Sequence, residues 1–320
     1  MQKTHPDYRG QCADRHPDPL IRETGRKPRS AVCSRSHARR DLLAWSPCNK
    51  DNRRLAPIVC MLVLGMPLVS GCSNQSHILP FQWTPNQPFS RAAIVAISLR
   101  EWRRFGEQVN DDDHLNWDKP ERNEGLWQRV GEYWYVGMNP GTIESHWTGK
   151  HDEYGHEFPL EDDGKYAWSA AFVSYVMRIA GAGPAFPYSP DHAVYINAAK
   201  RMTLGTDHGW LVRAERPDAY APVPGDLICY GRDQAASLRY DDLPTAELFP
   251  SHCDIVVEGP KVGVIPPVIS VIGGNVQDAV TMRHVPVTAE GRLARPDGVV
   301  LDQRWPWMVV LRVHEPASGS

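Results

Sequence analysis

Residues 166–183 read YAWSAAFVSYVMRIAGAG and carry the clearest structural pattern in the chain. Apolar residues recur there at three- and four-residue spacings, namely at Phe172, Val173, Val176, Met177 and Ala180. This spacing predicts a helix over 169–181 with a wide apolar stripe, ended by glycines at 181 and 183. A segment of this kind needs partners on its apolar side, so it is expected to lie at the centre of a folded domain.

Two further helices and a group of strands are predicted around this segment. Apolar spacing indicates helices over 91–109 and 191–202. Short β-branched stretches then predict strands over 226–230, 253–258, 268–272, 280–287 and 307–313. Helices followed by strands indicate an α+β domain, with N-terminal helices packed on a small antiparallel sheet of about five strands. Residues 114–165 are aromatic and irregular, and much of that stretch is left unassigned.

Charge divides the chain into a basic beginning and an acidic remainder. Residues 1–54 hold 13 Lys+Arg and 6 Asp+Glu, a balance of +7, and 55–71 hold none. Residues 72–320 hold 22 Lys+Arg and 32 Asp+Glu, a balance of −10. Because binding to nucleic acid phosphates requires a basic surface, this acidic domain argues against nucleic acid as a partner.

Residues 53–72, RRLAPIVCMLVLGMPLVSGC, resemble a bacterial lipoprotein signal. The apolar run after the two arginines is shorter than the ~20 residues of a membrane span and fits the core of a secretory signal. It ends in LVSGC, which resembles a lipobox and implies lipidation of Cys72, an anchor in the membrane and a place in the periplasm, at the outer membrane. A buried helix ending in Gly-Cys is the alternative. Residues 73–90 then read as a tether and 91–315 as the domain, while 1–52 are expected to be disordered or mis-annotated sequence before the signal.

Three polar residues suggest chemistry: Ser169, His252 and Asn275. A nucleophile at a helix start gains from the helix dipole and its free N–H groups. A histidine at the start of a strand can take its proton, and a polar third residue can orient the imidazole. Each also has an ordinary structural explanation, as helix cap, strand-end residue and turn residue respectively.

The surrounding motifs make a family resemblance specific. Residues 166–183, PGDLICY at 224–230, SHCDIVVE at 251–258 and ISVIGGNVQDAV at 269–280 resemble, in order and spacing, the NlpC-type and CHAP-type papain-like cell-wall hydrolases. The most specific resemblance, over about 90–315, is to domain-of-unknown-function family 2272. It implies a papain-like fold, cleavage of an amide or peptide bond in peptidoglycan, and no cofactor. Trp168, Tyr166, His192 and Asp254 are then expected to contact the wall peptide.

The sequence departs from the hydrolase pattern at the nucleophile, because Ser169 occupies the position where these hydrolases have a cysteine. A serine hydroxyl needs a base and an oxyanion hole to react, and asparagine stabilises an imidazolium less well than aspartate does. Asp254 lies two residues after His252, on the same strand face, and either supplies the missing carboxylate or lines the cleft. A catalytically inactive relative that binds wall peptides or an envelope protein is therefore the second hypothesis.

Cysteines and possible metal ligands add little to this interpretation. Cys229 and Cys253 allow one disulfide in an oxidising compartment, although Cys253 alone reads as a buried core residue. The group His151, Asp152, Glu153 and His156 has no known zinc spacing, so no metal is expected.

Overall fold

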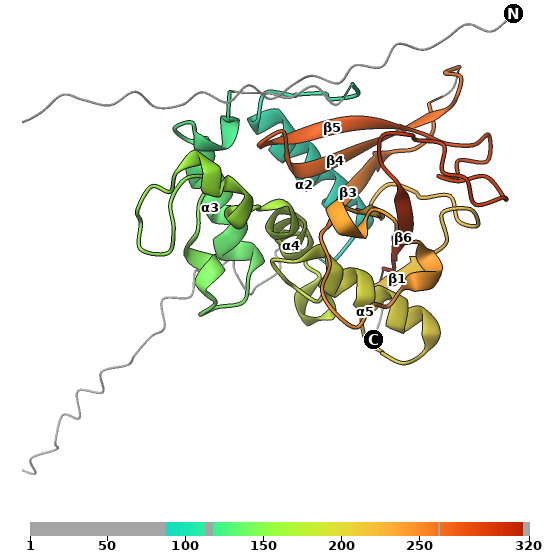
Figure 1. Ribbon diagram of the computed structural model, residues 1–320, viewed down its shortest axis with the longest axis horizontal. Helices are drawn as coiled ribbons and strands as arrows, with labels where there is room; N and C mark the ends of the chain where they lie inside the picture. Colours follow the sequence, from blue (N-terminus) through green and yellow to red (C-terminus); the bar gives the residue numbers. More distant parts are fainter. Residues whose placement is uncertain (1–87, 113–117, 262, 316–320) are drawn as a thin grey trace, which may run out of the picture. The chain divides into compact units, whose positions relative to one another are not determined.

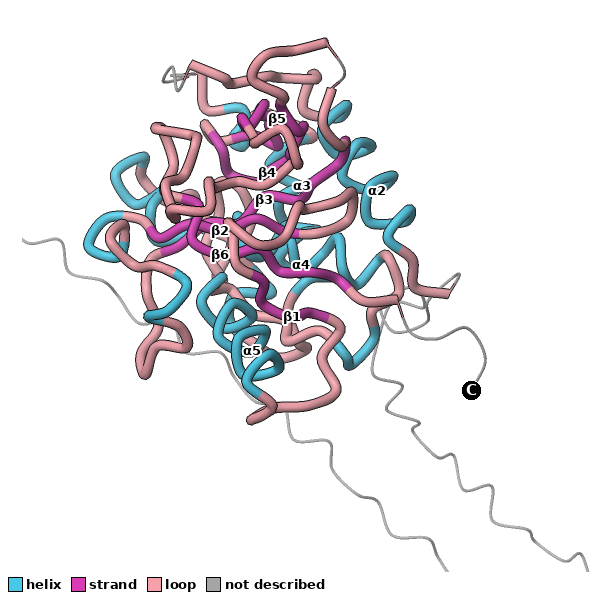
Figure 2. Tube along the Cα trace, turned by 90° about the vertical axis from the view of Figure 1, so that its right-hand side faces the viewer, coloured by secondary structure: helices cyan, strands magenta, loops and turns pink. Residues whose placement is uncertain are grey.

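An open six-stranded antiparallel sheet runs through the domain (Figure 1). Its strands lie in the spatial order β1-β6-β2-β3-β4-β5, and all six are labelled in Figure 2. The computed structural model describes residues 88–112, 118–261 and 263–315, all within the unit Gly71–Ser320. The strands are β1 (Val212–Glu215), β2 (Leu227–Gly231), β3 (Ser251–Glu258), β4 (Val268–Val276), β5 (Ala279–Pro286) and β6 (Trp307–Val313). The predicted extension, signal, lipidated Cys72 and most of the tether lie outside the described residues.

Helices cover one face of this sheet (Figure 2). The four α-helices of the described part are α2 (Arg91–Arg104), α3 (Leu126–Gly137), α4 (Ser169–Ile179) and α5 (His192–Leu204). Helices α2 and α4 contact β3 and β4, α5 contacts β1, and α3 packs on α4. Short 3-10 helices connect them: η1 (Pro120–Arg122), η2 (Ile143–His146), η3 (Leu160–Tyr166), η4 (Gly183–Ala185), η5 (Asp233–Ala235) and η6 (Tyr240–Asp242).

Helix α4 is enclosed because it lies between α3 and the sheet. Every residue from Ser169 to Arg178 is buried. Two glycines allow the close approach on either side: a Cβ at Gly137 would lie 2.7 Å from the Ala171 carbonyl oxygen, and one at Gly274 would lie 2.5 Å from Cβ of Phe172. Any larger residue at either position would push α4 away from its neighbour, because such separations are far below van der Waals contact.

The two faces of the sheet carry separate apolar cores. Along β3, Cys253 and Ile255 join the core under the helices, whereas Val256 joins a second core on the opposite face with Trp305 and Trp307. Alternation along the strand produces this division. Cys253 is a buried core residue, as expected, and it also forms the disulfide with Cys229 that the sequence allowed, which joins β2 to β3.

The prediction of an α+β domain with an antiparallel sheet is confirmed, and parts of its detail are wrong. Its papain-like fold stays a prediction. All five expected strands form, the last with the predicted ends and the other four with shifted ends. Strand β1 is a sixth that the prediction missed, and α3 fills part of the unassigned aromatic stretch. The first helix ends at Arg104 instead of residue 109. Helical turns are not confined to the N-terminal half, because η5 and η6 lie between β2 and β3. Within the described ranges, no helix combines the length and the apolar character of a membrane span.

A buried acid fixes the start of α4. Glu121 is 3% exposed, and its carboxyl accepts a hydrogen bond of 2.5 Å from the indole nitrogen of Trp168, the residue before α4. Burial, reinforced by the nearby charge of Asp278, raises the pKa of Glu121 to about 8. This carboxyl is therefore mostly protonated at neutral pH, since the neutral form is the one that burial favours.

This raised pKa predicts a specific pH dependence of folding. Because Glu121 binds its proton more tightly in the folded state, its contribution to stability is full below the unfolded pKa of 4.5 and declines as pH rises towards about 8. The slope contributed by this one group approaches ~1.4 kcal/mol per pH unit. Urea unfolding at pH 5, 6, 7 and 8 should show this decline in the wild type and a flatter profile in Glu121→Gln. Parallel profiles for the two proteins would contradict the assignment.

Candidate active site

Ser169 and His192 meet where two helices begin. Ser169 is the first residue of α4 and His192 the first of α5, and the Ser169 Oγ lies 2.7 Å from Nε2 of His192. Trp168 occupies the N-cap position of α4 without a side-chain cap bond, so Ser169 does not serve as the helix cap. The hydroxyl is instead committed to an imidazole at hydrogen-bond distance, the geometry required between a nucleophile and its base.

The environment keeps His192 uncharged. Burial lowers its pKa well below the usual value, and the charges of His252 and Arg232 lower it further. Its Nδ1 is hydrogen bonded to the hydroxyl of Tyr195, one turn along α5. Nε2 can accept the serine proton in the tautomer whose Nδ1–H donates to the Tyr195 oxygen. In that state the imidazole is a neutral, oriented base.

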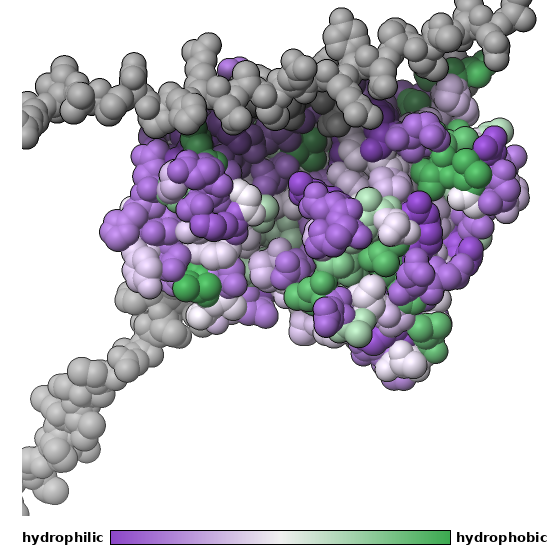
Figure 3. Space-filling view, viewed as in Figure 1, coloured by the Kyte–Doolittle hydropathy of each residue, from purple (hydrophilic) through white to green (hydrophobic). Residues whose placement is uncertain are grey.

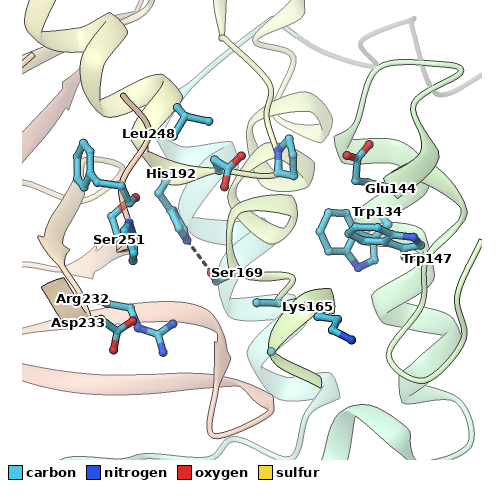
Figure 4. A pocket seen from close by; sticks show the side chains of 16 residues that line it. Trp134, Glu144, Trp147, Lys165, Ser169, His192, Arg232, Asp233, Leu248 and Ser251 are labelled. Atoms are coloured by element: carbon cyan, nitrogen blue, oxygen red, sulfur yellow. Dashed lines mark hydrogen bonds between the residues drawn. The ribbon is translucent and has the colours of Figure 1, made fainter. Parts of the chain in front are cut away.

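The pair opens onto a cavity of about 690 Å³. Figure 4 shows Ser169 and His192 between two walls, one with Trp134 and Trp147 and the other with Arg232 and Ser251. The face of the molecule shown in Figure 3 is largely hydrophilic, with its hydrophobic residues in separate small patches. Volume and lining suit part of a polar chain such as a peptide.

His252 lies beside this pair but has other partners. Its ring centre is 5.3 Å from that of His192, and its Nε2 is 2.9 Å from Asp254 Oδ1. Asp254 also pairs with Arg283, and all three side chains are buried. Alternation along β3 directs His252 and Asp254 away from the helix-covered face to which Cys253 belongs. The described contact of Ser169 is therefore with His192 rather than with the expected base.

Asn275 lies near the end of β4 and does not line the cavity beside Ser169. It has a positive φ of 55° and borders a second cavity, of about 370 Å³, together with His252 and Arg283. The described hydrogen bond of the His252 imidazole is with the Asp254 carboxylate. Asp254 therefore has the contact that was predicted for the Asn275 amide.

The remaining predicted contact residues lie in different places. Trp168 is 1% exposed and bonded to Glu121, so it belongs to the core. Tyr166 stacks on Phe158 with ring centres 4.0 Å apart, behind Trp147. Asp254 is fully buried, and of the four only His192 lines the larger cavity. In the described part of the chain, no group of three or more acidic, histidine or cysteine side chains is placed to hold a metal.

The sequence predicted His192 only as a contact for the wall peptide, not as the partner of Ser169. It gave no indication of Tyr195 or Arg283. The stretch Ser189-Pro190-Asp191-His192 contained a usable signal, because it places a histidine at a helix start. Asp191 is the N-cap by position but makes no side-chain cap bond. Burial raises the pKa of Asp191, and the charge of Glu144 across the cavity adds to the effect.

Comparison with protein families assigns residues 121–313 to a family described as an uncharacterized protein conserved in bacteria (DUF2272). The chain belongs to this family. The matched region contains the whole sheet, α3, α4, α5 and both cavities. Searches of curated proteins and of solved structures found no match. The likeness to NlpC-type and CHAP-type hydrolases consequently depends on the sequence motifs alone.

Gly273, within the region that the family match covers, leaves room for the side chains of His252 and Asp254. A Cβ at this position would lie 2.1 Å from Asp254 Oδ1 and 2.9 Å from His252 Nε2. Gly273→Ala should therefore displace the buried ion pair and lower the free energy of unfolding by about 2–4 kcal/mol. Chemical denaturation measures this loss. Gly259→Ala is the matched control because its Cβ would meet no atom within 4 Å, and equal stability of the two variants would contradict the prediction.

Proposed function

We propose that this protein is a serine-dependent hydrolase of amide or peptide bonds, acting on peptidoglycan from a lipid anchor in the cell envelope. The observation that carries the proposal is the 2.7 Å contact between Ser169 Oγ and Nε2 of His192 at the edge of an open cavity. Ser169 is the nucleophile and His192, rather than His252, is the general base.

The reaction follows from these positions. The Ser169 hydroxyl transfers its proton to Nε2 of His192 as its oxygen attacks the substrate carbonyl carbon. Backbone N–H groups in the first turn of α4 face the developing oxyanion, and the helix dipole favours the negative charge there. The imidazolium then gives its proton to the departing amine. Water, activated by the same imidazole, cleaves the acyl-enzyme. Tyr195 positions the imidazole through Nδ1.

Other observations support the proposed substrate and location. Peptidoglycan follows from the four motifs that resemble papain-like wall hydrolases, and a helix that begins with the nucleophile and packs on an antiparallel sheet is compatible with that fold. The membrane anchor follows from the lipobox at 68–72. The disulfide between Cys229 and Cys253 supports an oxidising compartment, such as the periplasm.

One observation favours the alternative, a relative that binds wall peptides or an envelope protein without cleaving them. Asp254 contacts His252 and Arg283, while the described partner of His192 at Nδ1 is the phenol of Tyr195. A phenol stabilises an imidazolium less than a carboxylate does. The same cavity would then bind the peptide as a receptor.

Muropeptide digestion by single variants tests the catalytic assignment. Ser169→Ala should abolish hydrolysis and His192→Ala should reduce kcat at least 1,000-fold, because each removes one half of the reacting pair. Activity that persists in His192→Ala but disappears in His252→Ala would return the role of base to His252.

Ser169→Cys separates the two candidate functions in the same assay. A wild type without activity, together with digestion by Ser169→Cys, would identify a binding protein on a competent scaffold. Circular dichroism of each variant verifies that loss of activity is not loss of folding.

The lowered pKa of His192 predicts the acid side of the pH profile. A general base must be unprotonated. Burial lowers the pKa of His192 well below its usual value of 6.5, so the imidazole stays neutral at pH values below 6.5. The acid limb of kcat/KM for muropeptide hydrolysis should therefore fall below pH 6.5. A limb centred at or above pH 6.5 would show that another group is the base.

A further inference from the structure

We propose that the second cavity is a subsite for a carboxylate of an acidic peptide, and that Arg232 is the residue that recognises it. The peptide class rests on the proposed function, whereas the recognition of a carboxylate rests on the geometry described below. The cavity has a volume of about 370 Å³, enough for one acidic side chain with water around it.

Arg232 stands between the two cavities. It follows the last residue of β2, its side chain is exposed, and it lines both the Ser169 cavity and the second cavity. Its positive charge contributes to the lowered pKa values of both His192 and His252. Figure 4 shows its guanidinium on the wall opposite Trp134 and Trp147. A group bound by Arg232 would therefore lie next to the reacting serine.

The guanidinium of Arg232 is available to a ligand. Over the described ranges it makes no hydrogen bond or ion pair with another side chain, and the adjacent Asp233 forms no ion pair with it. The other two arginines of the second cavity are already paired, Arg283 with Asp254 and Arg304 with Asp302. Arg232 is thus the cation of that cavity whose charge a ligand can neutralise.

The remaining lining suits an oxyanion. Arg283 is 2% exposed, and its Nε is buried without a hydrogen-bond partner. The Asn275 side chain, held at the cavity by a positive φ, adds an amide donor. Asp233 is the opposing charge at the rim. A planar guanidinium fork matches a carboxylate in two parallel hydrogen bonds.

Among the residues that the structure describes, the second cavity presents one unpaired arginine, in a domain that is acidic overall. Residues 72–320 carry a net charge of −10, and of the three arginines that line the cavity, Arg283 and Arg304 are paired with aspartates. An acidic domain repels anionic ligands over most of its surface. Local recognition of a carboxylate therefore requires a cation such as Arg232 at the point of contact.

Equilibrium binding to the Ser169→Ala protein tests this subsite without turnover. The probes are a wall-derived muropeptide with free carboxylates and the same muropeptide after conversion of its carboxylates to carboxamides. Calorimetry should give a Kd about tenfold lower for the acidic form, the effect of one charge-assisted pair. Arg232→Gln should remove this discrimination, and Asp233→Asn should increase it. Arg295→Gln, an exposed arginine in a segment that borders neither cavity, is the matched control and should leave it unchanged.

Three results would overturn the subsite. They are equal binding of the two probes, discrimination that survives Arg232→Gln, and failure of both probes to bind. Displacement of the acidic muropeptide by millimolar phosphate but not by acetate would instead assign the cavity to a phosphate group and reject the carboxylate. Because the experiment measures binding in a protein that lacks the Ser169 hydroxyl, its outcome is separate from the outcome of the catalytic test.

Discussion

The hydrogen bond between Ser169 and His192 depends on how closely α4 can lie between its neighbours. The two residues come from the starts of different helices, so their side chains meet at 2.7 Å only while both helices keep their positions. Glycines at 137 and 274 allow α4 to contact α3 on one side and β4 on the other without a Cβ between them. Packing density therefore sets the distance between the Ser169 hydroxyl and the His192 imidazole.

Different hydrogen-bond partners give the two neighbouring imidazoles different chemistry. Both have lowered pKa values, chiefly because burial disfavours the charged form. The partners of His192 are hydroxyl groups, whereas His252 is bonded to Asp254. Burial alone would raise the pKa of Asp254, but Arg283 and His252 outweigh it and keep the carboxylate charged. The sheet thus holds a fixed ion pair on its far face, whereas His192, the proposed base at the helix starts, is neutral.

Most of the fold could be predicted from the sequence, and the choice of base could not. Apolar spacing located α4 and five strands because burial on one side leaves a periodic trace in the sequence. Helix α3 was left unassigned because glycines within and beside it are poor helix formers, although its buried residues Val130, Tyr133, Trp134 and Gly137 keep a helical spacing. Alternation along β3 correctly placed Asp254 beside His252, but the same rule directs both away from the helix-covered face. Only the three-dimensional arrangement of α4 and α5 selects His192 as the partner of Ser169.

A buried neutral imidazole would also explain why a serine fits at position 169, where the hydrolases that the sequence motifs resemble have a cysteine. A cysteine nucleophile is most reactive as a thiolate beside an imidazolium, and the desolvated site of His192 disfavours that charged histidine. A serine pair is neutral at rest and needs charge only during the reaction. Arg232 adds to the lowering of the His192 pKa while it is unpaired. A substrate carboxylate bound to Arg232 would neutralise that charge and raise the proton affinity of His192, so the base would become stronger when a substrate is present.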